Sequence, residues 1–343
     1  MAGPGFAGSG LKAFVSGCAG SQLSEGERRF FHDARPCGLI LFKRNCVAPE
    51  QIRRLVEAFR EAVDDRQALV LIDQEGGRVQ RLVPPMWRRY PAGRRFGDLY
   101  LRRPELGLEA ARLGARLIAR DLASLGINVN CAPVLDLPVP GAHDVIGDRA
   151  YGTTTGVVSA LSRAVAEGYL DGGVLPVIKH IPGHGRAEAD SHASLPVIRA
   201  TREEMSRTDF VPFKSLRDLP LAMTAHVLIP AIDPEAPASA SPRIIGDIVR
   251  GEIGFDGLLM CDDIGMGALS GTMAERTRAG LAAGCDVALH CSGSLKEMEA
   301  VASASPELGG EAAHRFDAAR ARLTPDQPFD EARAEALLGE VLV

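Results

Sequence analysis

The segment KHIPGHGRAEADSH, from Lys179 to His192, holds three of the eight histidines of the chain within fourteen residues. Histidine suits proton transfer because its ordinary pKa lies closest to neutral pH. Asp190 and His192 stand two residues apart and can meet if the backbone turns between them. A carboxylate on one imidazole nitrogen fixes the tautomer and leaves the other nitrogen to exchange a proton. The segment therefore predicts an acid/base, His192, assisted by Asp190.

A long loop carries these residues. Positions 181–200 show neither a helical nor a strand period, and structureless loops of that length in compact domains are usually functional. Gly183 and Gly185 flank His184 and let the backbone bend. We therefore expect the loop to lie over a pocket and to be able to move there. For His184 itself, and for His226, the sequence favours structural roles.

Further charged residues stand at the ends of apolar runs. Charged side chains can gather at one rim of a protein with little cost in free energy only when water or a ligand contacts them. For any single one a rim salt bridge is an equal explanation, and Lys179 in particular would pair with Asp73 or Asp136. Taken together, they indicate a site. The residues are Asp73, Asp136, Lys179, His180, His226, Asp262 and Asp263.

Eight short apolar runs predict the strands that position these side chains, and amphipathic segments lie between them. Strands that alternate with helices form a parallel sheet, and eight strands close a (β/α)8 TIM barrel, whose sites lie at the carboxyl ends of the strands. An open doubly wound sheet is the alternative, but no G-x-G-x-x-G follows the first run. The runs span residues 13–17, 38–42, 68–73, 128–134, 174–179, 221–227, 257–262 and 286–291.

Helix signals support this alternation. Residues 51–63 place their apolar side chains on one helical face. A second helix is expected to begin at Pro104 and to stop at Gly126, and a capping box at Thr201 starts another. The residues after Cys291 suffice for a closing helix and a tail, so we expect residues 1–343 to form a single catalytic domain.

Composition narrows the class of partner. The net charge is −5, and aromatic residues make up only 5 %, which argues against nucleic-acid binding. No apolar run approaches the ~20 residues of a membrane span. Seven cysteines without paired spacing indicate reduced thiols and a cytoplasmic protein. VSGCAG, at positions 15–20, is similar to a lipoprotein processing site, but no basic start precedes it. We expect a monomer that binds a small molecule.

The motifs KHIPGHG and DSH, together with LIDQEGGRVQRL and CDD, resemble those of glycoside hydrolase family 3. Within that family they are similar to the single-domain bacterial β-N-acetylglucosaminidases of peptidoglycan recycling. The similarity runs from about Gly38 to Cys291. It implies a TIM barrel, a retaining mechanism, no metal or other cofactor, and an amino-sugar or muropeptide substrate.

The resemblance also implies roles for individual residues. The nucleophile would be Asp262, the first Asp of CDD, and the acid/base would be His192 with Asp190. The sugar would be bound by Asp73, Arg81, Arg149, Lys179 and His180.

The chain departs from the family pattern at Ile181, at Cys261 and in the residues Ile264 to Met266. Cys261 stands where a serine is usual, and its side chain should point away from Asp262 if both lie on one strand.

Other functions stay open at this point. The histidines and Asp262 could form the zinc site of a metal-dependent barrel hydrolase, although no His-x-His follows the first strand. A sugar-binding protein without catalysis is a second alternative, but a binder needs neither a nucleophile nor a proton shuttle. A third is phosphorolysis, in which phosphate replaces water as the acceptor.

Overall fold

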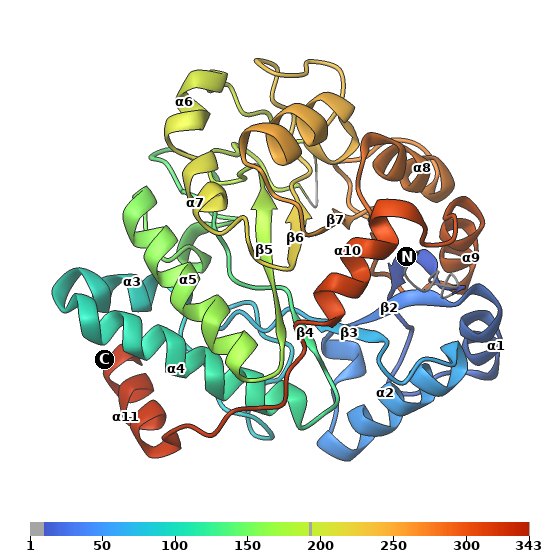
Figure 1. Cartoon of the computed structure of the whole chain (residues 1–343), viewed down its shortest axis with the longest axis horizontal. Coiled ribbons are helices and arrows are strands. Elements are labelled where there is room, and N and C mark those ends of the chain that lie inside the picture. Colours follow the sequence, from blue (N-terminus) through green and yellow to red (C-terminus); the bar gives the residue numbers. More distant parts are fainter. Residues whose placement is uncertain (1–9, 192–193, 343) are drawn as a thin grey trace, which may run out of the picture.

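Eight parallel strands form a closed barrel in the computed structural model, which describes residues 10–191 and 194–342. Each strand pairs with the next, and β8 pairs with β1 to close the ring. The expected (β/α)8 barrel is thereby confirmed, and the strands lie inside a ring of helices (Figure 1). The strands are β1 (Lys12–Ser16), β2 (Pro36–Leu41), β3 (Leu69–Ile72), β4 (Val129–Asn130), β5 (Leu175–Ile181), β6 (Leu221–Thr224), β7 (Leu258–Asp263) and β8 (Val287–His290).

All eight strands fall within or beside the predicted apolar runs, for a physical reason. A parallel strand in a barrel is covered on both faces, by the barrel interior and by the outer helices, so it reads as a continuous apolar run. The residues of β3, for example, are at most 1 % exposed. β4 is the shortest strand because Pro133 follows shortly and lacks the N–H that a ladder requires.

The helices alternate with the strands and cover the barrel. No helix among the described residues is both long enough and apolar enough to span a membrane. The α-helices are α1 (Glu25–Ala34), α2 (Pro49–Val63), α3 (Gly93–Arg102), α4 (Pro104–Ala123), α5 (Thr155–Asp171), α6 (Arg202–Arg207), α7 (Phe210–Ser215), α8 (Met273–Ala283), α9 (Leu295–Ala304), α10 (Gly310–Arg320) and α11 (Glu331–Leu342). Short helical turns are η1 (Lys43–Asn45), η2 (Gly147–Arg149), η3 (Ala238–Ala240) and the π-helix η4 (Ile244–Glu252).

The helix boundaries follow the signals in the sequence, with one correction. α4 begins at Pro104 as predicted, and its last turn precedes Gly126, which has a positive φ of 80°. Thr201 caps α6 by accepting a hydrogen bond from the Glu204 N–H. The predicted capping box is only half formed, because the Glu204 carboxylate pairs with Arg186 of the preceding loop at 2.6 Å.

The last residues form an arm that runs back across the barrel. After α10 the chain crosses α4 and α5, and α11 lies beside α4, far from it in sequence (Figure 1). The Arg116 guanidinium holds this arm by binding the Asp326 carboxylate at 2.8 Å and by donating to the Gln327 carbonyl. Gln327 also donates its N–H to the Asp171 carbonyl at 3.0 Å. We call residues 321–342 the C-terminal arm.

Candidate active site

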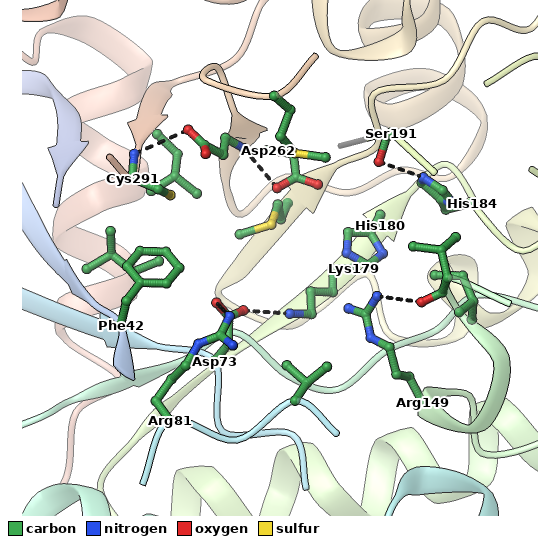
Figure 2. A pocket seen from close by; sticks show the side chains of 18 residues that line it. Phe42, Asp73, Arg81, Arg149, Lys179, His180, His184, Ser191, Asp262 and Cys291 are labelled. Atoms are coloured by element: carbon green, nitrogen blue, oxygen red, sulfur yellow. Dashed lines mark hydrogen bonds and ion pairs between the residues drawn. The ribbon is translucent and has the colours of Figure 1, made fainter. Parts of the chain in front are cut away.

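A cavity of about 270 Å³ opens at the carboxyl ends of the barrel strands. Six predicted site residues line it together, and Figure 2 shows them converging from different strands and loops. Phe42, Val79, Met223, Met266 and Leu289 supply apolar walls. A concave site with a few convergent polar groups in apolar walls is typical of a small-molecule pocket. The six predicted residues are Asp73, Arg81, Arg149, Lys179, His180 and Asp262.

Lys179 lies at the centre of the polar floor. Its ammonium nitrogen lies 2.9 Å from Asp73 Oδ1 and 2.7 Å from Glu75 Oε1, and its side chain is 2 % exposed. Of the two partners considered for Lys179, Asp73 and Asp136, the structure shows Asp73, and it adds Glu75. Burial alone would lower the pKa of Lys179, but the two carboxylates raise it above its ordinary value. The two carboxylates therefore favour the cationic form of the lysine.

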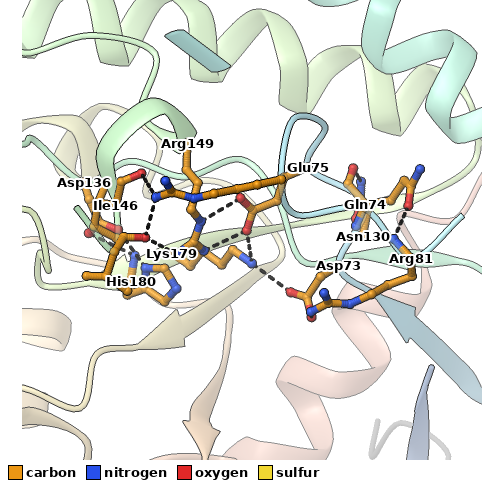
Figure 3. A network of polar contacts seen from close by, with 12 residues as sticks. Asp73, Gln74, Glu75, Arg81, Asn130, Asp136, Ile146, Arg149, Lys179 and His180 are labelled. Carbon is orange, nitrogen blue, oxygen red and sulfur yellow. Dashed lines mark hydrogen bonds and ion pairs between the residues drawn. The ribbon is translucent and has the colours of Figure 1, made fainter. Parts of the chain in front are cut away.

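Two arginines extend this pairing in opposite directions. Arg81 binds Asp73 at 3.0 Å, and Arg149 binds both oxygens of Glu75 at 2.8 and 2.9 Å. The result is a row of alternating charges, Arg81, Asp73, Lys179, Glu75 and Arg149, which we call the charge chain (Figure 3).

The charge chain sets the ionisation of its own carboxylates. Burial would raise the pKa of both, but Lys179 and Arg81 hold the pKa of Asp73 well below its usual range. Arg149 and Lys179 likewise lower the pKa of Glu75 to about 2. Three cations against two anions leave the row with one net positive charge.

A pair of buried amides shapes the turn that carries Asp73 and Arg81. The Asn130 side chain exchanges two hydrogen bonds of 3.0 Å with the backbone of Gln74, as two paired strands would. The Gln74 side-chain oxygen then accepts from the N–H groups of Arg81 and Leu82 at 2.9 and 3.0 Å. These contacts close the turn between Asp73 and Arg81 and bring both side chains to the same wall of the pocket.

The two glycines of the EGG sequence make the turn possible. Gly76 has a φ of 99°, and a side-chain carbon there would lie only 2.1 Å from the Pro91 carbonyl oxygen. Gly77 has a φ of 57°, another conformation that other residues rarely adopt. A residue with a side chain at either position would push Glu75 out of the charge chain.

His180 is oriented by a buried aspartate. Its Nδ1 lies 2.7 Å from Asp136 Oδ2, and Asp136 Oδ1 accepts the backbone N–H of His184 at 2.7 Å. Burial would raise the pKa of Asp136, but His180 lowers it below its ordinary value, so the carboxylate is ionised and only accepts hydrogen bonds. His180 must donate from Nδ1, which leaves Nε2 for a ligand in the pocket.

The adjacent carboxylates at the end of β7 have different environments. Asp262 lines the pocket, and its Oδ1 accepts the N–H of Asp263 at 2.8 Å. Burial would raise the pKa of Asp262, but His180 above all, with that N–H, keeps it below its ordinary value. Asp263 accepts from the N–H groups of Gly265 and Cys291 at 2.9 and 3.2 Å, yet burial raises its pKa. Of the two carboxylates, Asp262 is therefore the one whose surroundings favour the ionised form.

Cys261 points away from the pocket, as expected. Its sulfur accepts the Leu289 N–H at 3.4 Å and faces Gly280 on α8. Burial raises the pKa of the thiol to about 12. The thiol is thus inert and separated from the Asp262 carboxylate by the strand.

The loop after β5 packs against the pocket. His184 Nε2 lies 3.2 Å from the Ser191 hydroxyl, and Ser191 lines the cavity. The Ala268 N–H, beyond β7, donates to the Ser191 carbonyl at 3.1 Å. His184 also lines the cavity, so the structural role expected for it stays a prediction. The predicted acid/base His192 lies outside the described residues, and Asp190 lies in the same loop, where its carbonyl accepts from Ser194.

The structure adds residues that sequence reasoning missed. Glu75 joins the charge chain, and its only signal was its position two residues after Asp73 in a glycine-rich turn. Gln74 and Asn130 carried no signal of this role, because Gln74 follows one apolar run and Asn130 lies within another. Across residues 10–191 and 194–342 there is no group of three histidine, cysteine or acidic side chains that could hold a metal ion.

With the geometry established, comparison with known proteins identifies the family. The glycosyl hydrolase family 3 N-terminal domain matches residues 14–325. The chain belongs to glycoside hydrolase family 3. The resemblance found in its motifs is confirmed, and this family 3 protein is a glycoside hydrolase.

The sequences and structures of known relatives can be matched to this glycoside hydrolase along most of its length. A β-hexosaminidase from Alkalilimnicola ehrlichii is 40 % identical over 285 residues, which cover 82 % of this chain and 81 % of the relative. A family 3 β-N-acetylglucosaminidase from a Paenibacillus species has a TM-score of 0.86 and 30 % identity, and the match covers 96 % of this chain but 66 % of that one. NagZ from Neisseria gonorrhoeae, solved with N-trifluoroacetyl-D-glucosamine, has a TM-score of 0.84 and 28 % identity, with 96 % and 97 % coverage.

Proposed function

We propose that this glycoside hydrolase is a retaining β-N-acetylhexosaminidase that removes terminal β-linked N-acetylglucosamine from muropeptides. The observation that carries the proposal is Asp262, a partly buried carboxylate that lines the pocket at the end of β7 and whose surroundings favour its ionised form. The names of the β-hexosaminidase relatives and the N-acylated glucosamine bound by the gonococcal NagZ support the choice of sugar.

The first step is attack by Asp262 on the anomeric carbon. A retaining glycosidase forms a covalent glycosyl-enzyme through an oxocarbenium-like transition state. The nucleophile must be an anion whose position is fixed, and the Asp263 N–H holds Asp262 Oδ1 at 2.8 Å. The positive charge that develops on the sugar is stabilised by this carboxylate before the bond forms.

The leaving sugar requires a proton, and His192, assisted by Asp190, is proposed to donate it and later to activate water. The assignment rests on the family motif DSH. Support comes from the neighbouring Ser191, which lines the pocket and therefore brings this part of the loop to the reaction centre. A histidine replaces the second carboxylate that most glycosidases use.

The sugar hydroxyls are proposed to bind to the charge chain and to His180. Asp73 can accept hydrogen bonds, while Arg81, Arg149 and Lys179 can donate them. His180 presents Nε2 to the same space. The enzyme would act on small muropeptide fragments in the cytoplasm, as a monomer formed by one catalytic domain and without a cofactor.

A single assay tests the proposal. Metal-stripped protein is incubated with a chromogenic β-N-acetylglucosaminide and, in parallel, with the matching β-glucoside. Release from the first substrate alone supports the amino-sugar hydrolase. No release from either, or release that needs added zinc, would contradict it. A 5-fluorinated N-acetylglucosaminyl fluoride should label Asp262, and a label on Asp263 or Glu75 would refute the assigned nucleophile.

A further inference from the structure

His226 lies behind the end of β7, and each of its ring nitrogens makes a hydrogen bond. It follows β6 and is 0 % exposed. Its Nε2 lies 3.0 Å from the Asp263 carbonyl oxygen, and its Nδ1 lies 2.6 Å from the Ser239 hydroxyl on η3. A carbonyl oxygen can only accept, so Nε2 carries the hydrogen, and the Ser239 hydroxyl must then donate to Nδ1.

These contacts lead directly to the proposed nucleophile. The carbonyl of Asp263 accepts from His226 and from the Met266 N–H, each at 3.0 Å, and the N–H of Asp263 donates to Asp262 Oδ1 at 2.8 Å. The Asp263 carboxylate is in turn held by the Gly265 and Cys291 N–H groups. Residue 263 is thus fixed at its carbonyl and its side chain, and its remaining polar group orients the Asp262 carboxylate.

We propose that His226 is a positioning residue for Asp262: through the Asp263 backbone it fixes the N–H that orients the attacking oxygen. The inference rests on the proposed function, because it needs Asp262 to be the nucleophile. It adds a hydrogen-bonded sequence of four residues, from Ser239 through His226 and Asp263 to Asp262, that no motif in the chain indicates.

A role for His226 in proton transfer does not fit the same contacts. Neither nitrogen is left to meet a substrate, and the side chain is absent from the described residues that line the pocket. Burial lowers the pKa of the imidazole, while the charged groups that face it, Asp262 and Asp263, act in the opposite direction. The ring is a neutral donor and acceptor of fixed tautomer.

The experiment compares three variants with a matched control. Ser239→Ala removes the group that sets the tautomer, His226→Leu removes both hydrogen bonds, and His226→Gln keeps an amide N–H near the position of Nε2. Ser241→Ala is the control: Ser241 is a buried serine two residues from Ser239, and its hydroxyl binds Asp233 instead, at 2.6 Å.

Three quantities are measured for each protein: kcat/KM on the chromogenic substrate, the labelling rate and sugar binding. The rate at which the fluorinated glycosyl fluoride labels Asp262 reports on the nucleophile, and calorimetric binding of N-acetylglucosamine reports on the intact pocket. We expect labelling and kcat/KM to fall about 10²-fold in His226→Leu, since small displacements of a reacting group have effects of that size. Ser239→Ala should lose about tenfold. His226→Gln should recover most of the rate, and sugar binding and the Ser241→Ala variant should stay within about twofold of the wild type.

The outcomes separate this proposal from the function on which it rests. Labelling of wild-type Asp262 with unchanged labelling rates in Ser239→Ala and His226→Leu would overturn the positioning role alone. If His226→Leu fails to fold, the Ser239→Ala rate decides in the same way. A wild-type label on another residue would overturn the proposed function, and the positioning role with it. Slow labelling with normal sugar binding, rescued by glutamine, supports both.

Discussion

Lys179 Nζ lies 2.7 Å from Glu75 Oε1, in a part of the pocket floor from which water is nearly excluded. Glu75 also holds Arg149 through both carboxylate oxygens. One acid therefore compensates two of the three cations of the charge chain. Removing one partner of a buried ion pair leaves an uncompensated charge, which costs more than the pair itself contributes.

Glu75→Gln should therefore destabilise the protein and weaken catalysis together. We expect a loss of about 3 kcal/mol in the free energy of unfolding, because both Lys179 and Arg149 keep their charge without their shared anion. The ratio kcat/KM should fall about 10²-fold as the two cations move. Urea unfolding and steady-state kinetics measure the two effects. Glu57→Gln, at a half-exposed acid that lies 3.9 Å from Arg66, is the control and should change neither.

Asn130→Ala should raise KM without preventing folding. The substitution removes both hydrogen bonds to the Gln74 backbone, so the turn between Asp73 and Arg81 loses its support. We expect kcat/KM to fall at least about tenfold, following the loss of about 1 to 3 kcal/mol for unmade buried hydrogen bonds. Asn128→Ala is a close control, because Asn128 makes the same type of contact, to Val70 and Ala68, away from the pocket. An equal kinetic loss in both variants would show that Asn130 acts only on stability.

The stability of the protein should fall on acidification below pH 6.5, in part because of His184. Burial, followed by the neighbouring His180, lowers the pKa of His184 from 6.5 to about 4. Between these values the unfolded chain binds a proton that the folded chain does not, so stability decreases as the pH falls through this window and changes no further below pH 4. The limit of the effect is about 3 kcal/mol. Thermal melts from pH 7 to 4 should show a smaller decrease for His184→Asn. The exposed His32 provides the control, His32→Asn, and an unchanged slope in His184→Asn would contradict the assignment.

Cys261→Ser should leave catalysis almost unchanged. The thiol faces α8 on the side of β7 opposite to the pocket, and the Leu289 N–H donates to it. A serine hydroxyl in its place would still accept that hydrogen bond, so kcat and the pH profile should stay within about twofold, with at most a modest loss of stability. Native protein should also resist alkylation at Cys261, because burial raises its pKa to about 12. A large gain in kcat for the serine variant would contradict this expectation, because it would show that the side chain at position 261 affects the proposed nucleophile, Asp262.

The strands and the main site residues were predictable because their signals are local. A buried parallel strand reads as an apolar run, and the charged residue that ends it, such as Asp73 or Asp262, marks the rim at which ligands bind. Folding then brings these ends together whatever the connecting loops do. The sequence could for this reason place Lys179 near Asp73 or Asp136, but it could not decide between the two.

The supporting residues were not predictable, because their partners come from distant elements. Glu75 depends on a turn formed by Gly76 and Gly77, whose path has no period. The roles of Asn130 and His226 are set by hydrogen bonds to Gln74 and to Asp263, which lie 56 and 37 positions away in the chain. Hydrogen bonds between such distant residues depend on the path of the folded backbone, so neither composition nor spacing predicts them.

The C-terminal arm binds α4 and α5, the two helices that flank β4 in the sequence, and β4 is the shortest strand of the barrel. The arm therefore reinforces the barrel where the ladder of hydrogen bonds is weakest. During synthesis the ribosome makes this segment after all eight strands, so the region between β3 and β5 lacks these contacts until the arm has left the ribosome. Final consolidation of the barrel thus follows synthesis of the arm, and a chain stalled after β8 would expose the unsupported α4–β4–α5 region to chaperones and proteases.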